Sequence, residues 1–244
     1  MKIIAIMIGR GGSSLKDKNI LPVHGVPLLC YAAAAAKRSK YITDFYISSD
    51  CPKILSVASD AGYKKINRPI HLSSPTAQSC DAILHAIEQI ELKEMVDIVV
   101  VQHANVGTIT ETIIDNCVKQ LIEDKNISAV VPVHEKSEYN PYRAKKILSD
   151  GLLCPFIDNG KEKVSANRQD LPKSYFFDHS IWALRSSSIK NQDNGQLPWK
   201  CMGNKIKPYI TTGCFDVHSL EDIKSTEKWI VENNIPIPNI NRVK

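Results

Sequence analysis

The sequence lacks an apolar run long enough to cross a lipid bilayer, which takes about 20 consecutive apolar residues. Its first residues, MKIIAIMIGR, carry only a short apolar stretch and no small-residue cleavage site, so we expect no secretory signal. The seven cysteines include no C-x-x-C pair, and Cys30, Cys80 and Cys117 fall within helical patterns, as reduced core cysteines commonly do. We therefore expect a cytoplasmic protein without structural disulfides.

Strong charge of one sign is also absent. The formal net charge is +5 over 244 residues, and the cations are scattered rather than gathered with aromatic residues in one stripe. We therefore expect neither nucleic acid nor a membrane as a partner, and a small anionic ligand fits the charge better. A hydrophobic content of 43% suffices for one large core, so a single main domain over residues 1–244 is expected.

Apolar runs with strand character alternate with amphipathic helical patterns along most of the chain. The runs that predict strands are 3–7, 44–49, 96–102, 127–133, 179–185 and 206–212, and the patterns that predict helices are 26–40, 52–61, 76–92, 110–124 and 218–234. This alternation predicts an α/β fold with a mostly parallel sheet between helices. Ser219 is the expected N-cap of the last helix, with Asp222 as its capping-box partner.

The pattern changes between residues 134 and 177, where short β-like pieces, Asn-Pro and Asp-Gly turn signals and many charges occur. We interpret this range as a β-rich insertion within the single domain. Because a few short strands pack poorly alone, we expect the insertion to lie against the main sheet or to exchange with a second subunit, which would make a homodimer.

The first strand leads into a loop rich in glycine, serine and cations, GRGGSSLKDKN (9–19). Its glycines let the backbone approach an anion closely, and its cations can neutralise phosphate. These residues are Gly9, Gly11, Gly12, Arg10, Lys16 and Lys18. The loop matches neither G-x-G-x-x-G nor G-x-x-x-x-G-K-[ST], which excludes a dinucleotide motif and a P-loop. It predicts a nucleotide or other anion site, and an ordinary solvated turn is the alternative.

Further stretches follow this loop in a recognisable order. They are YISSD (46–50), NRP (67–69) with SPTAQS (74–79), VVVQ (99–102), NRQDLP (167–172) and FDVHSLEDI (215–223). Together with the loop they resemble the acylneuraminate cytidylyltransferases, the CMP-sialic acid synthetase family, which includes enzymes that activate related nonulosonic acids. The resemblance spans nearly the whole chain. It implies a Rossmann-like, three-layer sheet of the nucleotidyltransferase type, with the insertion used for dimerisation.

The resemblance also implies a reaction, in which the anomeric hydroxyl of a sialic-acid-like 3-deoxy-2-ketoacid sugar attacks the α-phosphorus of CTP, with Mg²⁺ or Mn²⁺ balancing charge. The implied nucleotide-binding residues are Gly9, Arg10, Gly11, Gly12, Ser13, Ser14, Lys18, Asn19, Arg68 and Gln102. Arg10, Lys16, Lys18 and Asp216 would be catalytic, because fixed charges stabilise the leaving pyrophosphate. The sugar acid is expected to contact Gln102, His103, Arg143, Arg168, His179 and Trp182, with the guanidinium groups suiting its carboxylate.

The chain departs from the family pattern in the loop and in the metal site. Ser14 stands in place of a lysine, for which Lys16 is the expected substitute. The family's QPTSPLR segment is replaced by QHANVGT (102–108), and a second metal-binding aspartate, following Asp216, is replaced by His218. We expect Asp216 and His218 at the metal.

Three histidines, Asp216, Trp182 and Asp50 have roles that the sequence alone leaves open. His103, Asp216 and His218 could together hold a metal softer than Mg²⁺; alternatively, Asp216 alone steers a hydrated Mg²⁺ while the histidines bind the loop and precede a helix N-cap. His179 is either a pocket hydrogen-bonding group or general base, or a satisfied sheet-edge histidine. Trp182 stands where the family often has a substrate-pocket tyrosine, and Asp50 is expected as a helix N-cap.

Two other functions remain compatible with these departures. The altered 102–108 segment keeps open another sugar nucleotidyltransferase with a different nucleotide or sugar. The His218 replacement keeps open a non-catalytic nucleotide- or sugar-binding homologue.

Overall fold

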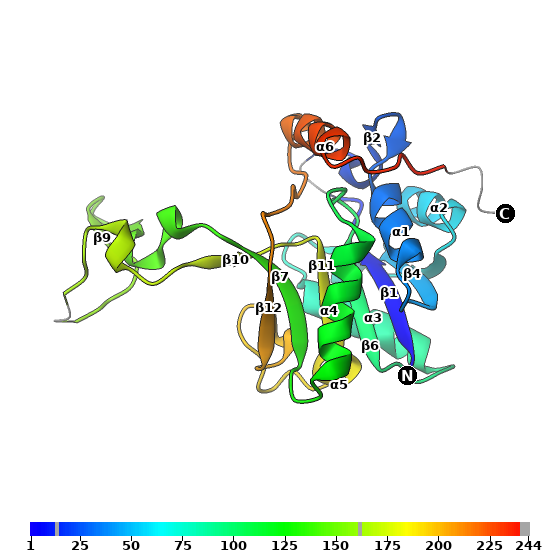
Figure 1. Cartoon of the computed structure of the whole chain (residues 1–244), viewed down its shortest axis with the longest axis horizontal. Coiled ribbons are helices and arrows are strands. Elements are labelled where there is room, and N and C mark those ends of the chain that lie inside the picture. The colour runs from blue at the N-terminus through cyan, green and yellow to red at the C-terminus, as the bar shows by residue number, and fades with distance from the viewer. Residues whose placement is uncertain (13–14, 161–162, 240–244) are drawn as a thin grey trace. The chain divides into compact units, whose positions relative to one another are not determined.

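The computed structural model describes residues 1–12, 15–160 and 163–239 (Figure 1). Its contacts divide the chain into two compact units. Unit 1 comprises Met1–Pro132, His179–Tyr209 and Cys214–Lys244, and unit 2 comprises Val133–Asp178 and Ile210–Gly213. No helix in the described part of the chain is long and apolar enough to cross a membrane.

The sheet of unit 1 is built around β1 (Ile3–Ile8). This strand pairs in parallel with β4 (Asp44–Ser49) on one side and with β6 (Ile98–His103) on the other, and β4 pairs in parallel with β5 (Lys64–Asn67). β11 (Ile181–Arg185) runs antiparallel between β6 and β7 (Ala129–Glu135), and β12 (Ile206–Ile210) also pairs with β7. The predicted mostly parallel sheet is confirmed, with the order β7-β11-β6-β1-β4-β5.

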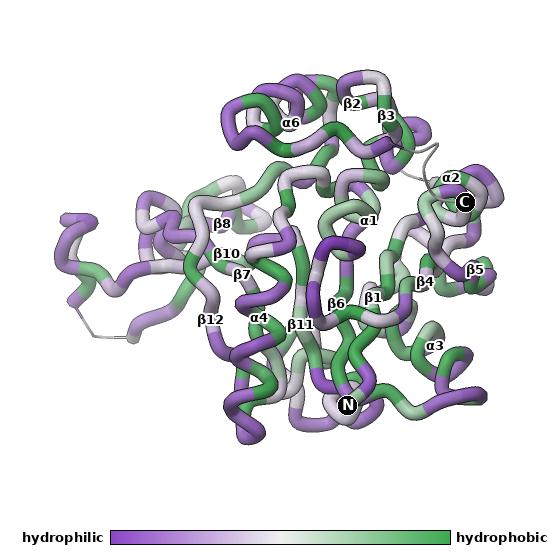
Figure 2. The backbone as a smooth tube through the Cα atoms, turned by 45° about the vertical axis from the view of Figure 1, so that its right-hand side comes forward, coloured by the Kyte–Doolittle hydropathy of each residue, from purple (hydrophilic) through white to green (hydrophobic). Residues whose placement is uncertain are grey.

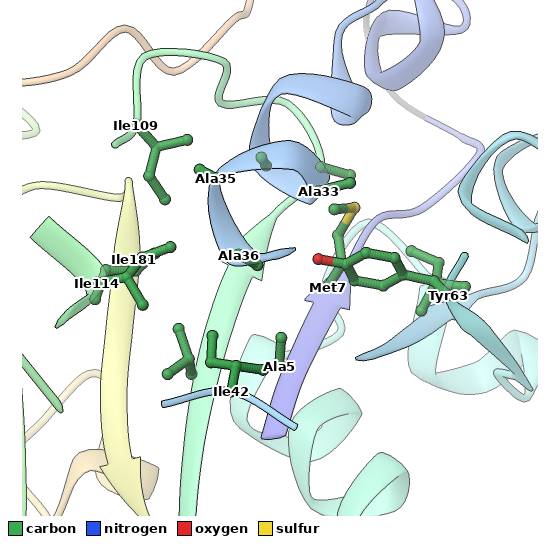
Figure 3. Close-up of a cluster of buried hydrophobic side chains, with 14 of the residues drawn as sticks. Ala5, Met7, Ala33, Ala35, Ala36, Ile42, Tyr63, Ile109, Ile114 and Ile181 are labelled. Carbon is green, nitrogen blue, oxygen red and sulfur yellow. The ribbon is translucent and has the colours of Figure 1, made fainter. Parts of the chain in front are cut away.

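Helices cover both faces of this sheet, as three layers require. Ala5 and Met7 of β1 pack in the main core with α1 (Leu29–Arg38), α2 (Pro52–Asp60) and α4 (Glu111–Glu123) (Figure 3). α3 (Ser79–Glu91) contributes nothing to that cluster but contacts β1 and β4, which places it on the opposite face. β1 and β6 are hydrophobic over most of their length (Figure 2), because both of their faces are buried.

The predicted helix start at residue 26 is wrong. β2 (Pro22–Val23) and β3 (Val26–Pro27) form a two-stranded antiparallel hairpin, so Pro27 pairs with Pro22 instead of occupying a first helical turn. The physical reason is the turn between them, in which His24 and Gly25 both have positive φ, of 45° and 78°. Two successive left-handed residues are the hairpin geometry that matches strand twist.

The last helix, α6 (Leu220–Glu232), begins as predicted. The Ser219 side chain accepts from the Asp222 N–H, and the Asp222 carboxylate accepts from the Ser219 N–H, which completes the capping box. α6 packs on the β2–β3 hairpin through a small second core that includes Val23, Val217 and Ile223. This core anchors the segment that carries Asp216. The short helix α5 (Ser186–Lys190) follows β11.

The expectation of no disulfide is wrong for one pair. Cys80, in the first turn of α3, is bonded to Cys201 in the 3-10 helix η6 (Lys200–Met202), and both residues are buried. The two cysteines are 121 residues apart, so no local spacing motif marks the pair.

Unit 2 is composed of short elements. β8 (Lys145–Ile147) and β9 (Leu153–Pro155) form a hairpin, and β10 (Tyr175–Phe177) pairs antiparallel with residues 133–135 of β7. Three single-turn 3-10 helices complete it, η3 (Ser137–Tyr139), η4 (Pro141–Arg143) and η5 (Arg168–Asp170). Its role in dimerisation stays a prediction.

Candidate functional site

A cavity of about 200 Å³ lies in unit 1 where β1 and β6 end. Open α/β sheets bind ligands beyond the carboxyl ends of their strands, and this cavity has that position. The predicted site residues that line it are Gly9, Arg10, Lys18, Asn19, Arg68 and His103. The rest of the lining consists of Ile8, Leu72, Ser74, Ala77, Gln78, Ser79, Ala82 and Asn105.

Two glycines of the loop after β1, Gly9 and Gly11, lie so close to neighbouring residues that a side chain would not fit. A Cβ atom at Gly9 would lie 2.8 Å from the Ala104 Cβ atom, and Asn19 is buried beside it. The Asn19 amide donates to the Arg10 carbonyl at 3.0 Å, which fixes the start of the loop. Close backbone approach therefore explains the glycine at position 9.

The next glycine has a partner that the sequence did not indicate. The Gly11 N–H donates to the Asp50 carboxylate at 3.0 Å, and a Cβ atom at Gly11 would lie 2.9 Å from the Cys51 Cβ atom. The predicted N-cap role of Asp50 is wrong, because Cys51 occupies the N-cap of α2. Gly12 is exposed, and the predicted contacts of Ser13 and Ser14 lie outside the described residues.

Three cations line the cavity, and hydrogen bonds hold the side chains of Arg10 and Arg68 in position. Arg10 donates to the Ser74 carbonyl at 2.7 Å, and the buried Arg68 donates to the Ser48 hydroxyl at 3.1 Å and carbonyl at 2.6 Å. Burial lowers the pKa of Arg68 to about 10, and it also lowers the pKa of Lys18, against the opposing effect of Asp216. Positive groups held in a partly desolvated cleft are suited to a polyanionic ligand. Lys16 is exposed and does not line this cavity, so its predicted role stays untested.

Asp216 stands close to this group of cations. Its Oδ2 atom lies 3.2 Å from the His218 Nε2 atom, and its Oδ1 atom accepts from the Asn105 amide. Among the described residues no three His, Cys, Asp or Glu side chains gather as a metal site, so the three-residue set with His103 is not formed. One partly exposed carboxylate fits Mg²⁺, which proteins commonly hold through one or two carboxylates plus substrate phosphates. His218 as a second ligand stays a prediction.

Gln102 does not line the cavity, and its predicted ligand contacts stay a prediction. Gln102 is fully buried; its Oε1 atom accepts from the Tyr63 hydroxyl at 2.7 Å, and its Nε2 atom donates to the Ala32 carbonyl at 2.6 Å. The cause is the strand pleat. Gln102 is paired in register with Met7, whose side chain belongs to the main core, whereas the next residue, His103, faces the cavity.

Trp182 does not line the cavity either, and its predicted contact with the sugar acid stays a prediction. Trp182 is fully buried, and its ring centroid lies 4.6 Å from that of His103, so its ring packs against the histidine. Burial and the neighbouring His179 lower the pKa of His103 to about 3, which keeps this imidazole neutral. His179 is half-buried, 5.5 Å from Trp199 between ring centroids, and its pocket role stays a prediction.

The remaining predicted residues belong to unit 2. Arg143 lies in η4 and Arg168 in η5, and both side chains are exposed. Their contacts with a sugar acid stay predictions.

Sequence reasoning missed several residues that line the cavity. Ser74, Gln78 and Ser79 belong to a stretch that carried the resemblance, but no role was assigned to them. Asn105 lies within the segment that departs from the family pattern. A polar side chain inside a replaced segment was the available signal for it.

Comparison with known proteins gives the family. A family model described as Cytidylyltransferase matches residues 4–188. The chain is 29% identical over 177 residues to the "Pseudaminic acid cytidylyltransferase and UDP-2,4-diacetamido-2,4,6-trideoxy-beta-L-altropyranose hydrolase" of Helicobacter pylori, covering 72% of this chain and 33% of that protein. It is 27% identical over 240 residues to the "Post-translational flagellin modification protein B" of Campylobacter coli, covering 96% and 97% of the two chains.

A solved structure shares the fold. The CMP:2-keto-3-deoxy-manno-octonic acid synthetase complexed with CTP superimposes with a TM-score of 0.69 at 14% sequence identity, covering 96% of this chain and 100% of that one. At this identity the likeness concerns the fold alone. The family model covers most of the described sheet and the glycine loop with its cations. This chain therefore belongs to the cytidylyltransferase family.

Proposed function

We propose that this protein transfers CMP from CTP to a nonulosonic acid, a sialic-acid-like 3-deoxy-2-ketoacid sugar, and releases pyrophosphate. The observation that carries the proposal is the cavity at the ends of β1 and β6, which Arg10, Lys18 and Arg68 line, with Asp216 close to Lys18. The relatives that are named as pseudaminic acid and N-acylneuraminate cytidylyltransferases support the choice of sugar class.

At the α-phosphorus the reaction forms one bond and breaks one. The anomeric oxygen of the sugar bonds to the α-phosphorus of CTP, the bond from that phosphorus to the bridging oxygen breaks, and the hydroxyl proton leaves to solvent. Negative charge grows on the departing pyrophosphate. Arg10, Lys18 and Arg68 bind the phosphates and stabilise this charge without rearranging, because hydrogen bonds and packing already hold Arg10 and Arg68.

Asp216 would hold Mg²⁺ together with the nucleotide phosphates. The ion, when bound, supplies further neutralisation of phosphate charge. The neutral imidazole of His103 lines the same cavity and can donate or accept a hydrogen bond without adding charge.

The sugar carboxylate and a partner subunit complete the proposal. The exposed guanidinium groups of Arg143 and Arg168 are suited to a carboxylate. Unit 2 also exposes large apolar side chains, among them Tyr139, Ile147 and Leu153 at 69%, 74% and 68%. Exposed apolar area of this kind supports a homodimer joined through residues 134–177, and a monomeric mass by light scattering at micromolar concentration would contradict it.

The function is tested with the purified chain, each of the four nucleoside triphosphates, Mg²⁺ or Mn²⁺, and a panel of sugar acids, by measuring pyrophosphate release. We expect release with CTP and one or a few nonulosonic acids. Arg10→Met should lower kcat/KM about 100-fold, the usual effect of removing one group that stabilises a developing anion. Lys119→Met, which removes a cation from the exposed face of α4, is the control for net charge. Release with another nucleotide and none with CTP would refute the proposal.

A further inference from the structure

Asn105 connects the end of β6 to the segment that carries Asp216. Its Nδ2 atom donates to the Asp216 Oδ1 atom and, at 3.3 Å, to the Val217 carbonyl. Its own carbonyl accepts from the Val217 N–H at 3.0 Å, and the neighbouring Val106 forms an isolated antiparallel bridge with Asp216. Asn105 also lines the cavity. One residue therefore contacts the backbone and the carboxylate of the Asp216 segment.

The orientation of the Asn105 amide follows from chemistry. Both groups that its side chain contacts, a carboxylate oxygen and a backbone carbonyl, are acceptors. Only the NH₂ end of the amide can serve two acceptors, so the nitrogen must face them. An aspartate at this position would instead place a second negative charge beside Asp216.

The two oxygens of the Asp216 carboxylate have different surroundings. Oδ1 is held by Asn105, while Oδ2 faces the His218 imidazole at 3.2 Å. The His218 side chain is 64% exposed, and pairs so exposed contribute little free energy. A cation can therefore displace His218 from Oδ2 at low cost, provided that Oδ1 keeps the carboxylate oriented.

We propose that Asn105 is a positioning residue, which holds the Asp216 carboxylate in the orientation that binds the metal–nucleotide complex. The inference rests on the proposed function, because it requires that Asp216 is a metal ligand. Groups that hydrogen-bond to a metal-binding carboxylate typically raise the metal affinity about 10- to 100-fold. Asn105 acts through Asp216 and need not contact CTP.

The experiment measures binding without turnover. CTP affinity is measured by calorimetry in the absence of sugar acid, once with EDTA and once with Mn²⁺. The ratio of the affinity in Mn²⁺ to the affinity in EDTA gives the metal-dependent part of CTP binding. We expect Asn105→Ala and the near-isosteric Asn105→Leu to reduce this ratio about tenfold or more, since the ratio divides out any change in the metal-free affinity. In the Asp216→Ala background the same changes should have no further effect, as expected for one shared interaction.

Asn116→Ala is the matched control, because this half-buried amide donates to the Tyr209 hydroxyl at 3.0 Å and does not line the cavity. It should keep the wild-type ratio. Two results would overturn the inference: a wild-type ratio in both Asn105 variants, or a further loss of the ratio in the Asp216→Ala background. A wild type that binds CTP but shows no Mn²⁺ effect would also overturn it, and with it the metal role of Asp216. A wild type that binds no CTP at all would refute the proposed function itself.

Discussion

Gln102→Met tests whether the polar residue at the end of β6 serves the core or the ligand. The substitution conserves most of the side-chain volume and removes both amide hydrogen bonds, the one accepted from Tyr63 and the one donated to Ala32. Gln102 is fully buried and Tyr63 is 2% exposed, so water cannot replace the lost partner of the hydroxyl. We therefore expect a loss of stability and no direct effect on the nucleotide.

The magnitude follows mainly from the Tyr63 hydroxyl. The Ala32 carbonyl lies inside α1 and keeps its regular helical hydrogen bond from the N–H four residues later. Losing the bond from Gln102 therefore costs less stability at this carbonyl than at the Tyr63 hydroxyl. A buried hydroxyl without its partner costs about 1–3 kcal/mol. With an unfolding entropy of about 2.1 cal/mol/K per residue, a chain of 244 residues loses about 2–6 °C of its melting temperature.

The assay combines thermal unfolding with CTP binding. Adding Tyr63→Phe to Gln102→Met should restore part of the stability, because replacing both partners with apolar groups of similar shape is nearly neutral. CTP affinity at a temperature where both variants are folded should equal that of the wild type. An unchanged melting temperature combined with weaker CTP binding would refute the core assignment and restore the ligand contact predicted from the sequence.

Two further predictions concern His103 and the glycines of the loop after β1. Burial lowers the pKa of His103 to about 3 in the folded protein, whereas a histidine of the unfolded chain has a pKa near 6.5. The free energy of unfolding is therefore at its full value above pH 6.5. It falls on acidification by at most about 1.4 kcal/mol per pH unit. His103→Phe should remove about 2 kcal/mol of the stability difference between pH 7.5 and 5.0 in urea unfolding, and an unchanged difference would contradict the burial argument. Gly9→Ala should lower the free energy of unfolding by about 1–3 kcal/mol, because the new Cβ atom would lie 2.8 Å from the Ala104 Cβ atom. Gly12→Ala is the control and should be tolerated, because a Cβ atom there meets nothing within 4 Å. Equal losses of stability in the two variants would refute the packing argument.

The fold was predictable wherever one signal dominated locally. The buried runs of β1 and β6 are apolar without alternation, and β4 begins and ends at the predicted residues. The β2–β3 hairpin was missed because the Ala-rich run after it favours a helix, and the left-handed pair His24 and Gly25 has only one glycine. The pairing of Cys80 with Cys201 depends on tertiary contacts across 121 residues.

The site was predictable where residue type alone limits the role. A glycine and an arginine directly after a buried strand predict an anion site, and Gly9 and Arg10 do line the cavity. Gln102 and His103 could not be separated in this way. The preceding valines do not alternate with polar residues, so the sequence does not show which of the two faces the helices of the core.

Two departures from the resembled family meet at Asp216 in the structure, although Asn105 and Asp216 are 111 residues apart in the sequence. The replaced segment 102–108 supplies Asn105, and the replaced metal-site aspartate is His218; both side chains contact the Asp216 carboxylate. Where the family pattern has a second carboxylate, this site therefore has one carboxylate with a neighbour on each oxygen. Such a site attracts a free divalent cation less strongly than a pair of carboxylates. Under the proposed function, the nucleotide phosphates would supply most of the negative charge that binds the ion, as is common for Mg²⁺ in sites with few protein ligands.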